Sequence, residues 1–179
     1  MNRNKRVPLL LAAAALVLAA VLIVIAVGSS VGRRSEAETL RQFYAAMYSE
    51  DGGGIEALID CLPPSQQAAY YDSITMGGTS FSQLNTWRME LLPLVGSEMQ
   101  VEVELLSDQS ESADDLSMMK TTYPGIDRYR MVAFRLTVSG SDGAEDFLGV
   151  MGLIHQDGCW YMTSADAGLK RVVNGESAQ

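Results

Sequence analysis

The sequence predicts an α+β fold, in which an N-terminal transmembrane helix is followed by helices packed on a curved antiparallel sheet. Three observations lead to this prediction. An uncharged stretch of 21 residues runs from Val7 to Val27. The chain from Ser35 to Pro93 repeats apolar residues with helical spacing, and the chain after Met99 alternates apolar and polar residues as strands do. Helices followed by an antiparallel meander imply two layers, because neither layer can bury its apolar face alone.

The segment Val7–Val27 is long enough to cross a bilayer, which takes roughly 20 apolar residues in a helix. Basic residues are denser before this segment, within residues 1–6, than after it, at Arg33 and Arg34. We therefore expect a cytoplasmic tail at 1–6 and the bulk of the chain outside the cell membrane of a bacterium. The alternative is a signal peptide cleaved before Ser29, although a signal core usually spans only about 7–15 residues.

The remainder of the chain divides into a linker at 28–36, one extracytoplasmic α+β domain at 37–173 and a disordered tail at 174–179. After Arg34 the chain carries 8 basic and 22 acidic residues, a net charge of −14. Such a domain is repelled by nucleic acid. The expected partners are membrane lipid, through Val7 to Val27, and either an envelope protein or a second copy of the chain.

The helical half begins with Ser35-Glu36-Ala37-Glu38, which has the form of a capping box. Apolar residues follow at i, i+3, i+4 and i+7, namely Leu40, Phe43, Tyr44 and Met47. A short second helix is predicted over 55–62, and Pro64 is placed to begin a third that runs to about residue 74. A second capping box at Ser80 predicts a fourth helix that ends at Pro93.

The strand half begins with alternation from Met99 to Leu105, and residues 107–115 are predicted to be a polar loop. Residues 116–123 are either a strand extension or an irregular connection. A strand over 128–138 places Arg128 and Arg130 on the same face as its apolar residues. A turn at 140–143 leads to a strand over 145–155, in which two glycines allow a bend or bulge. A hairpin turn at 156–158 precedes the last strand, 159–164, and a short helical tail is expected over 166–173.

This pattern resembles the nuclear transport factor 2-like superfamily over about residues 37–164. The resemblance is carried by the opening helix LRQFYAAMYSED, the helix over 55–62 and the closing hairpin GLIHQDGCWYMTS. The last of these contains Gly158-Cys159-Trp160-Tyr161, which is similar to a G-x-W-Y signature of that superfamily. The resemblance implies a cone-shaped α+β domain. It does not select a function, because this fold hosts enzymes, binding modules and scaffolds.

Five aromatic residues are candidates for lining a pocket inside such a cone. They are Tyr44, Tyr48, Trp87, Phe134 and Trp160. The alternative is that these rings are core packing. Asp60 and Arg135 are the polar side chains considered for the interior.

The two cysteines, Cys61 and Cys159, admit two interpretations. Outside the membrane they are able to form a disulfide that closes a long loop. Alternatively they are separate buried thiols, since free cysteine is among the most buried residue types. Their spacing does not decide between the two.

His155 is the only histidine, which excludes a metal site built from several histidine ligands. It is either a general base or, as we expect, an exposed residue at the end of a hairpin. An acidic cluster at Asp108, Glu111, Asp114 and Asp115 either binds calcium or forms a solvated loop, and without the EF-hand spacing we expect the loop. No cofactor motif or catalytic constellation is present. The sequence thus favours a non-catalytic binding or assembly domain, with a small apolar ligand-binding module or an envelope enzyme as alternatives.

Overall fold

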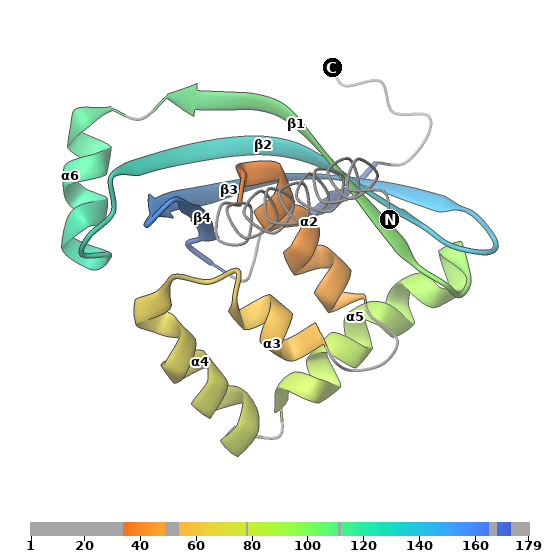
Figure 1. Ribbon diagram of the computed structural model, residues 1–179. Helices are drawn as coiled ribbons and strands as arrows, with labels where there is room; N and C mark the ends of the chain where they lie inside the picture. Colours follow the sequence, from red (N-terminus) through yellow and green to blue (C-terminus); the bar gives the residue numbers. More distant parts are fainter. Residues whose placement is uncertain (1–33, 49–53, 78, 111, 165–167, 173–179) are drawn as a thin grey trace, which may run out of the picture. The chain divides into compact units, whose positions relative to one another are not determined.

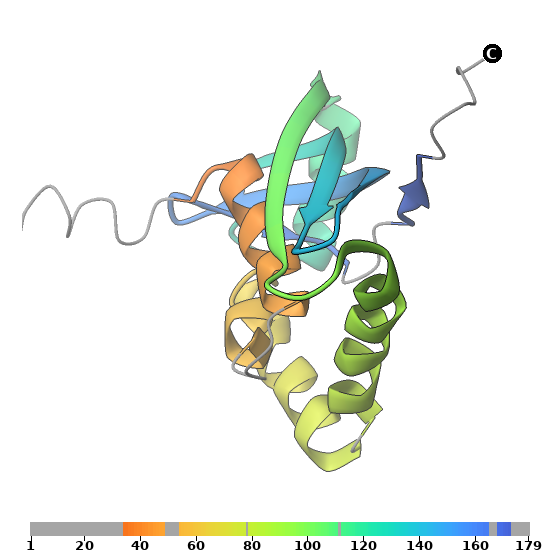
Figure 2. The same ribbon diagram turned by 90° about the vertical axis from the view of Figure 1, so that its right-hand side faces the viewer.

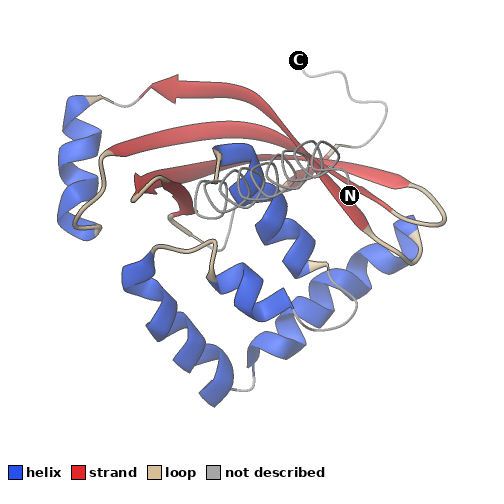
Figure 3. Ribbon diagram, in the orientation of Figure 1, coloured by secondary structure: helices blue, strands red, loops and turns tan. Residues whose placement is uncertain are grey.

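The computed structural model describes residues 34–48, 54–77, 79–110, 112–164 and 168–172. These residues form an α+β domain, as the sequence predicts (Figure 3). Its elements in chain order are helices α2 (Glu36–Met47), α3 (Gly54–Ile59), α4 (Pro64–Gly77) and α5 (Thr79–Val95), strand β1 (Gln100–Ser110), helix α6 (Ala113–Thr122), and strands β2 (Arg128–Ser139), β3 (Ala144–Gln156), β4 (Cys159–Met162) and β5 (Lys170–Arg171).

The predicted membrane helix at 7–27 and the predicted tails at 1–6 and 174–179 lie outside the described residues. Within the described ranges, no helix is both long enough and apolar enough to span a bilayer. The end of the predicted linker was placed wrongly, because residues 34–36 are part of the folded domain. The Ser35 side chain accepts a hydrogen bond from the Glu38 backbone N–H and so caps α2, while Glu36 is already helical.

The strands form a curved antiparallel sheet in the order β1-β2-β3-β4, and β5 pairs with β3 (Figure 1). Helix α2 lies across one face of this sheet, which we call the inner face (Figure 2). In the second part of β2, every second residue points to this face and is fully buried: Val132, Phe134, Leu136 and Val138. The residues between them, Met131 to Thr137, lie on the opposite, outer face and are half-buried or exposed.

The apolar stripe predicted for the first helix is confirmed as the face that α2 turns to the sheet. Leu40 and Phe43 are fully buried, and the rings of Tyr44 and Phe134 lie 5.8 Å apart between their centroids. Burying side chains of this size stabilises a domain by about 1.5–3 kcal/mol each relative to exposure. The core therefore sits between α2 and the inner face.

Helix α4 begins where the sequence predicts, whereas α5 differs from the prediction at both ends. Pro64 is the first residue of α4, as predicted, because a missing N–H is harmless at that position. Helix α5 begins at Thr79 rather than after a cap at Ser80, and it does not end at Pro93 but continues to Val95. Pro93 is tolerated because it lies in the last turn, where Gly96 closes the helix with φ of +80°.

The connection after β1 also differs from the prediction. β1 continues through Ser110 instead of ending in a loop, and residues 113–122 form helix α6 rather than a strand or irregular segment. The Ser112 side chain caps α6 by accepting a hydrogen bond from the Asp115 backbone N–H at 3.1 Å. α6 covers one end of the outer face, where Tyr123 and Ile126 pack against Ile154. This helix lies at the end of the sheet where β2 begins (Figure 1).

The turns between strands are as predicted. Gly140 N–H donates to Gly143 O at 2.9 Å between β2 and β3, and Asp157 and Gly158 join β3 to β4 with positive φ angles of 53° and 84°. Of the bend or bulge that the β3 glycines allow, the bulge does not form, since β2 and β3 pair without a register shift; the shift lies in β1 between Leu105 and Ser107. The expected helical tail is wrong too, because β5 forms a strand there.

Candidate functional site

His155 lies on the inner face at the end of β3, where three strands meet. The register places it opposite Arg128 of β2 and opposite Trp160 of β4. The prediction that it is exposed is wrong, because its relative exposure is 8 %. It is buried since the Trp160 ring packs on it, with 5.0 Å between the two ring centroids.

Both nitrogens of the His155 ring have polar neighbours. Nδ1 lies 2.5 Å from Oδ1 of Asp127, and the Asp127 backbone N–H donates to His155 O at 3.0 Å. A carboxylate only accepts hydrogen bonds, so Nδ1 carries the proton and Nε2 of the neutral ring is an acceptor. One nitrogen of the Arg128 guanidinium lies 3.2 Å from Nε2 and 3.3 Å from Nδ1, so it contacts the ring beside both nitrogens. His155 is thus held in one tautomer by neighbours of opposite charge.

The acid–base balance of Asp127 reflects this contact. Partial burial raises the pKa of the Asp127 carboxyl. The hydrogen bond and charge of His155, together with the charge of Arg128, lower this pKa by more than burial raises it. The net result is a pKa below the ordinary value for aspartate. The Asp127 side chain is 63 % exposed, so water also screens this pair.

The Trp160 ring contacts both arginines of the site. The guanidinium carbons of Arg128 and Arg130 lie 5.4 Å and 5.7 Å from its ring centroid, which are cation–π distances. Arg130 also forms an ion pair with Glu36 of α2 at 2.9 Å. The backbone of Trp160 is fixed as well, because its N–H donates to Arg34 O and its carbonyl accepts from the Thr39 hydroxyl at 2.9 Å.

The structure brings the five aromatic candidates together in one apolar cluster. Tyr44, Tyr48, Phe134 and Trp160 are buried, and Trp87 of α5 is partly buried against them. Burial, with the charge of Glu90, raises the pKa of Tyr48 to about 12. These rings contribute to the core between α2 and the sheet, and their role in lining a ligand pocket stays a prediction.

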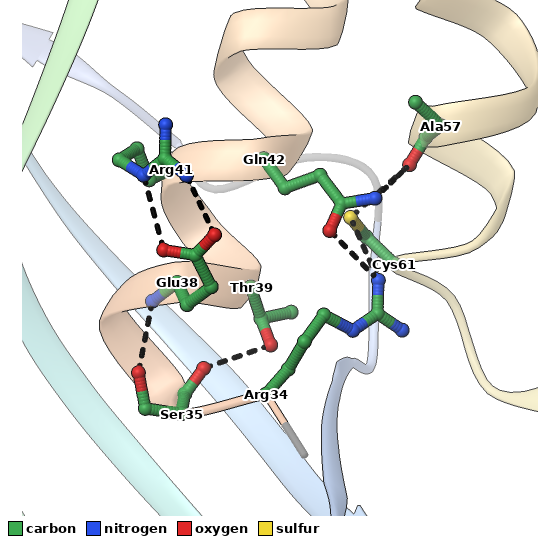
Figure 4. A network of polar contacts seen from close by, with 8 residues as sticks. All are labelled: Arg34, Ser35, Glu38, Thr39, Arg41, Gln42, Ala57 and Cys61. Carbon is green, nitrogen blue, oxygen red and sulfur yellow. Dashed lines mark hydrogen bonds and ion pairs between the residues drawn. The ribbon is translucent and has the colours of Figure 1, made fainter. Parts of the chain in front are cut away.

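Cys61 and Cys159 are both buried thiols that form no disulfide in the structure, which corresponds to the second of the two predicted alternatives. The Cys61 thiol donates to Ala57 O at 3.2 Å and accepts a contact from the Arg34 guanidinium at 3.7 Å (Figure 4). Arg34 also donates to Gln42 and to the Asp60 carbonyl. Burial raises the pKa of the Cys61 thiol to about 12, despite the nearby Arg34 charge.

The polar side chains considered for the interior are not there. Asp60 is exposed, and Arg135 lies on the outer face with an ion pair to Glu104 at 3.3 Å. Of the acidic cluster, Asp114 and Asp115 form the first turn of α6, where their charge favours the helix N-terminus. Across the described residues, no three histidine, cysteine or acidic side chains are grouped so as to hold a metal ion.

Asp127 and Arg128 are site residues that the sequence did not predict. One signal was present, because Arg128 and Arg130 share the parity of the buried residues of β2, and a charged residue on an inner face needs a partner. The partner was not visible, since it depends on the pairing of β2 with β3 and on the α6–β2 connection. Comparison adds no assignment to this site: no protein-family model matches the sequence, and no curated protein or solved structure is significantly similar to it.

Proposed function

We propose that this chain is a single-pass membrane protein whose extracytoplasmic domain is a non-catalytic assembly module. Support for the anchor comes from the uncharged segment Val7–Val27 and from the basic residues before it. The α+β architecture of the domain agrees with the resemblance to the nuclear transport factor 2-like superfamily, which is part of the same proposal. Confinement to a membrane raises the effective concentration of the domains for one another.

The observation that carries the assembly function is an apolar stripe on the outer face of the sheet. Met131, Leu148 and Val150 are 37 %, 42 % and 54 % exposed. They are neighbours in the register of β2 and β3. Leu148 and Val150 are two residues apart on β3, and Val150 pairs with Ala133, which is two residues from Met131 on β2. Adjacent exposed apolar side chains on a sheet are a typical feature of surfaces that bind another protein.

The charges beside this stripe favour a second copy of the chain as its partner. Leu148 pairs with Arg135 of β2 on one side and with Lys170 of β5 on the other. Glu104 of β1 pairs with Arg135, and Asp146 is two residues from Leu148 on β3. A two-fold contact can place the basic residues of one copy against the acidic residues of its partner, and the reverse. A rim that carries both signs is therefore self-complementary. The net charge of −14 after Arg34 opposes association, so salt should strengthen it.

The test uses two differently tagged full-length copies expressed in one membrane. Recovery of one tag with the other is expected for the natural sequence, and Val150→Glu should reduce it strongly, because each contact would then bury two like charges. Met118→Glu is the matched control, since Met118 is 63 % exposed on α6 and lies outside the stripe. Equal recovery for Val150→Glu and Met118→Glu would show that the outer face does not join two copies.

The location is tested separately. Protease added to intact cells stripped of their wall should remove the folded domain and leave a short membrane-protected fragment. A domain that is protected until the membrane is dissolved would place it in the cytoplasm. A domain released without any membrane-protected fragment would indicate a cleaved signal peptide instead of an anchor.

A further inference from the structure

Arg128 is an exposed cation that the structure holds in place without a carboxylate partner. Its guanidinium stacks on Trp160 and contacts the His155 ring, and among the described residues no carboxylate oxygen lies within 4.0 Å of it. The neighbouring Arg130, by contrast, is paired with Glu36. An arginine that is fixed by two rings and keeps donors directed to solvent is prepared to bind an anion.

His155 adds a second donor to this arrangement when it takes up a proton. In the neutral ring Nε2 is an acceptor, and a nitrogen of the Arg128 guanidinium lies 3.2 Å from it and 3.3 Å from Nδ1. After protonation Nε2 becomes an N–H donor, and two positive groups then face each other at that distance without an acceptor between them. An oxygen anion beside both groups would accept a hydrogen bond from each and remove the repulsion.

Around a protonated His155, one carboxylate, Asp127, faces the two cations His155 and Arg128. Asp127, from the α6–β2 connection, binds Nδ1 and does so in both protonation states. Glu36, from α2, is occupied by Arg130. Trp160, from β4, is uncharged. Protonation therefore leaves one net positive charge on this group of side chains, and the new N–H at Nε2 lies next to Arg128.

We propose that Arg128 and His155, backed by Trp160, form a binding site for an oxyanion, a carboxylate or a phosphate group, which is occupied when His155 is protonated. The site is on the inner face and shares no side chain with the outer stripe, so it is independent of the proposed assembly. Binding and protonation are linked reciprocally: a bound anion tightens proton binding by the factor by which the proton tightens anion binding. Tenfold tighter binding corresponds to about one pH unit.

The test follows the titration of His155, which needs no assignment because the chain has one histidine. The full-length protein with ¹³C-labelled histidine, in a non-ionic detergent, is titrated by NMR in chloride, sulfate and formate at equal ionic strength. Sulfate represents a phosphate group and formate a carboxylate, and neither titrates near neutral pH. We expect one of them to raise the midpoint by about 0.5–1 unit relative to chloride, a three- to tenfold linkage. The more effective anion identifies the ligand class.

Variants of two arginines on the same strand decide whether the effect belongs to this site. Arg128→Gln should abolish the anion-dependent shift, and Arg135→Gln, on the outer face, should keep it. Arg128→Lys keeps the charge without the planar fork, so it should retain a smaller shift. The proposal is overturned if neither anion moves the His155 midpoint, or if Arg128→Gln responds to the anion as the natural protein does. Val150→Glu leaves the shift unchanged, which separates this outcome from failure of the assembly proposal.

Discussion

The hydroxyl of Thr39 joins helix α2 to strand β4, and replacing Thr39 with valine measures that connection. Thr39 is fully buried, and its hydroxyl lies 2.9 Å from Trp160 O. Along a strand the N–H and C=O of one residue point to the same side. Because the Trp160 N–H donates to Arg34 O, the Trp160 carbonyl also faces away from β3 and depends on Thr39.

Valine has nearly the shape of threonine, so Thr39→Val removes the donor without creating a cavity. A buried acceptor left without a partner costs about 1–3 kcal/mol, and the added methyl group recovers part of this. We expect a net loss of about 1–2 kcal/mol. With a urea m value of about 2 kcal/mol/M, the midpoint of unfolding should fall by about 0.5–1 M. Tryptophan fluorescence of the full chain in detergent during urea titration gives this midpoint.

Thr121→Val is the matched control for this prediction. The Thr39 hydroxyl is also 3.0 Å from Ser35 O, four residues earlier, and the Thr121 hydroxyl makes the equivalent contact to Ser117 O at 3.4 Å. Thr121, however, is exposed on α6. Its replacement should change the free energy of unfolding by less than about 0.5 kcal/mol. Equal losses for Thr39→Val and Thr121→Val would refute the reasoning, because the interior bond to β4 would then contribute nothing.

Three further predictions concern a turn, an acid and a thiol. Gly140→Ala places Cβ 2.5 Å from a backbone carbonyl oxygen and should cost more than about 2 kcal/mol of unfolding free energy, whereas Gly143→Ala, 3.5 Å from its nearest atom, should be nearly neutral in the same urea assay. The lowered pKa of Asp127 contributes stability above the unfolded pKa of about 3.9, and this is lost as pH falls through the lower folded pKa, so Asp127→Asn should flatten the acid limb of a stability–pH curve. A steeper limb would contradict this assignment. With its pKa raised to about 12, Cys61 should resist iodoacetamide at pH 8 until urea is added, and a reducible link between Cys61 and Cys159 would contradict the free thiols of the structure.

Much of the fold was predictable because local signals and burial agree. The stripe of α2, the proline at the start of α4 and the Asp157-Gly158 hairpin each combine a spacing with a residue that fits only one local geometry. The class followed from the order of these segments. In a sequence with one stable fold, such local preferences agree with the positions that the residues take in the folded domain.

The segments that were predicted wrongly are those where local composition and tertiary structure disagree. Residues 107–110 are polar yet continue β1, because an edge strand with solvent-facing residues needs no apolar alternation. Helix α6 has no buried residue, so its apolar pattern was weak, although Ser112 followed by Asp115 was an available capping signal. The site at His155 depends on strand register, which spacing along the chain does not contain.

The way in which the chain enters the domain has a mechanical consequence. Arg34 is the first described residue, and its carbonyl binds the Trp160 N–H of β4 while its guanidinium binds the Asp60 carbonyl and contacts the Tyr161 ring. Met162 of β4 is likewise bonded, to Cys61 O. Tension applied through the residues before Arg34 is therefore passed to these contacts at the outer edge of β4 as well as to helix α2. A pull on this end of the domain would thus load its first helix and its last hairpin strand together, although the two come from opposite ends of the folded sequence.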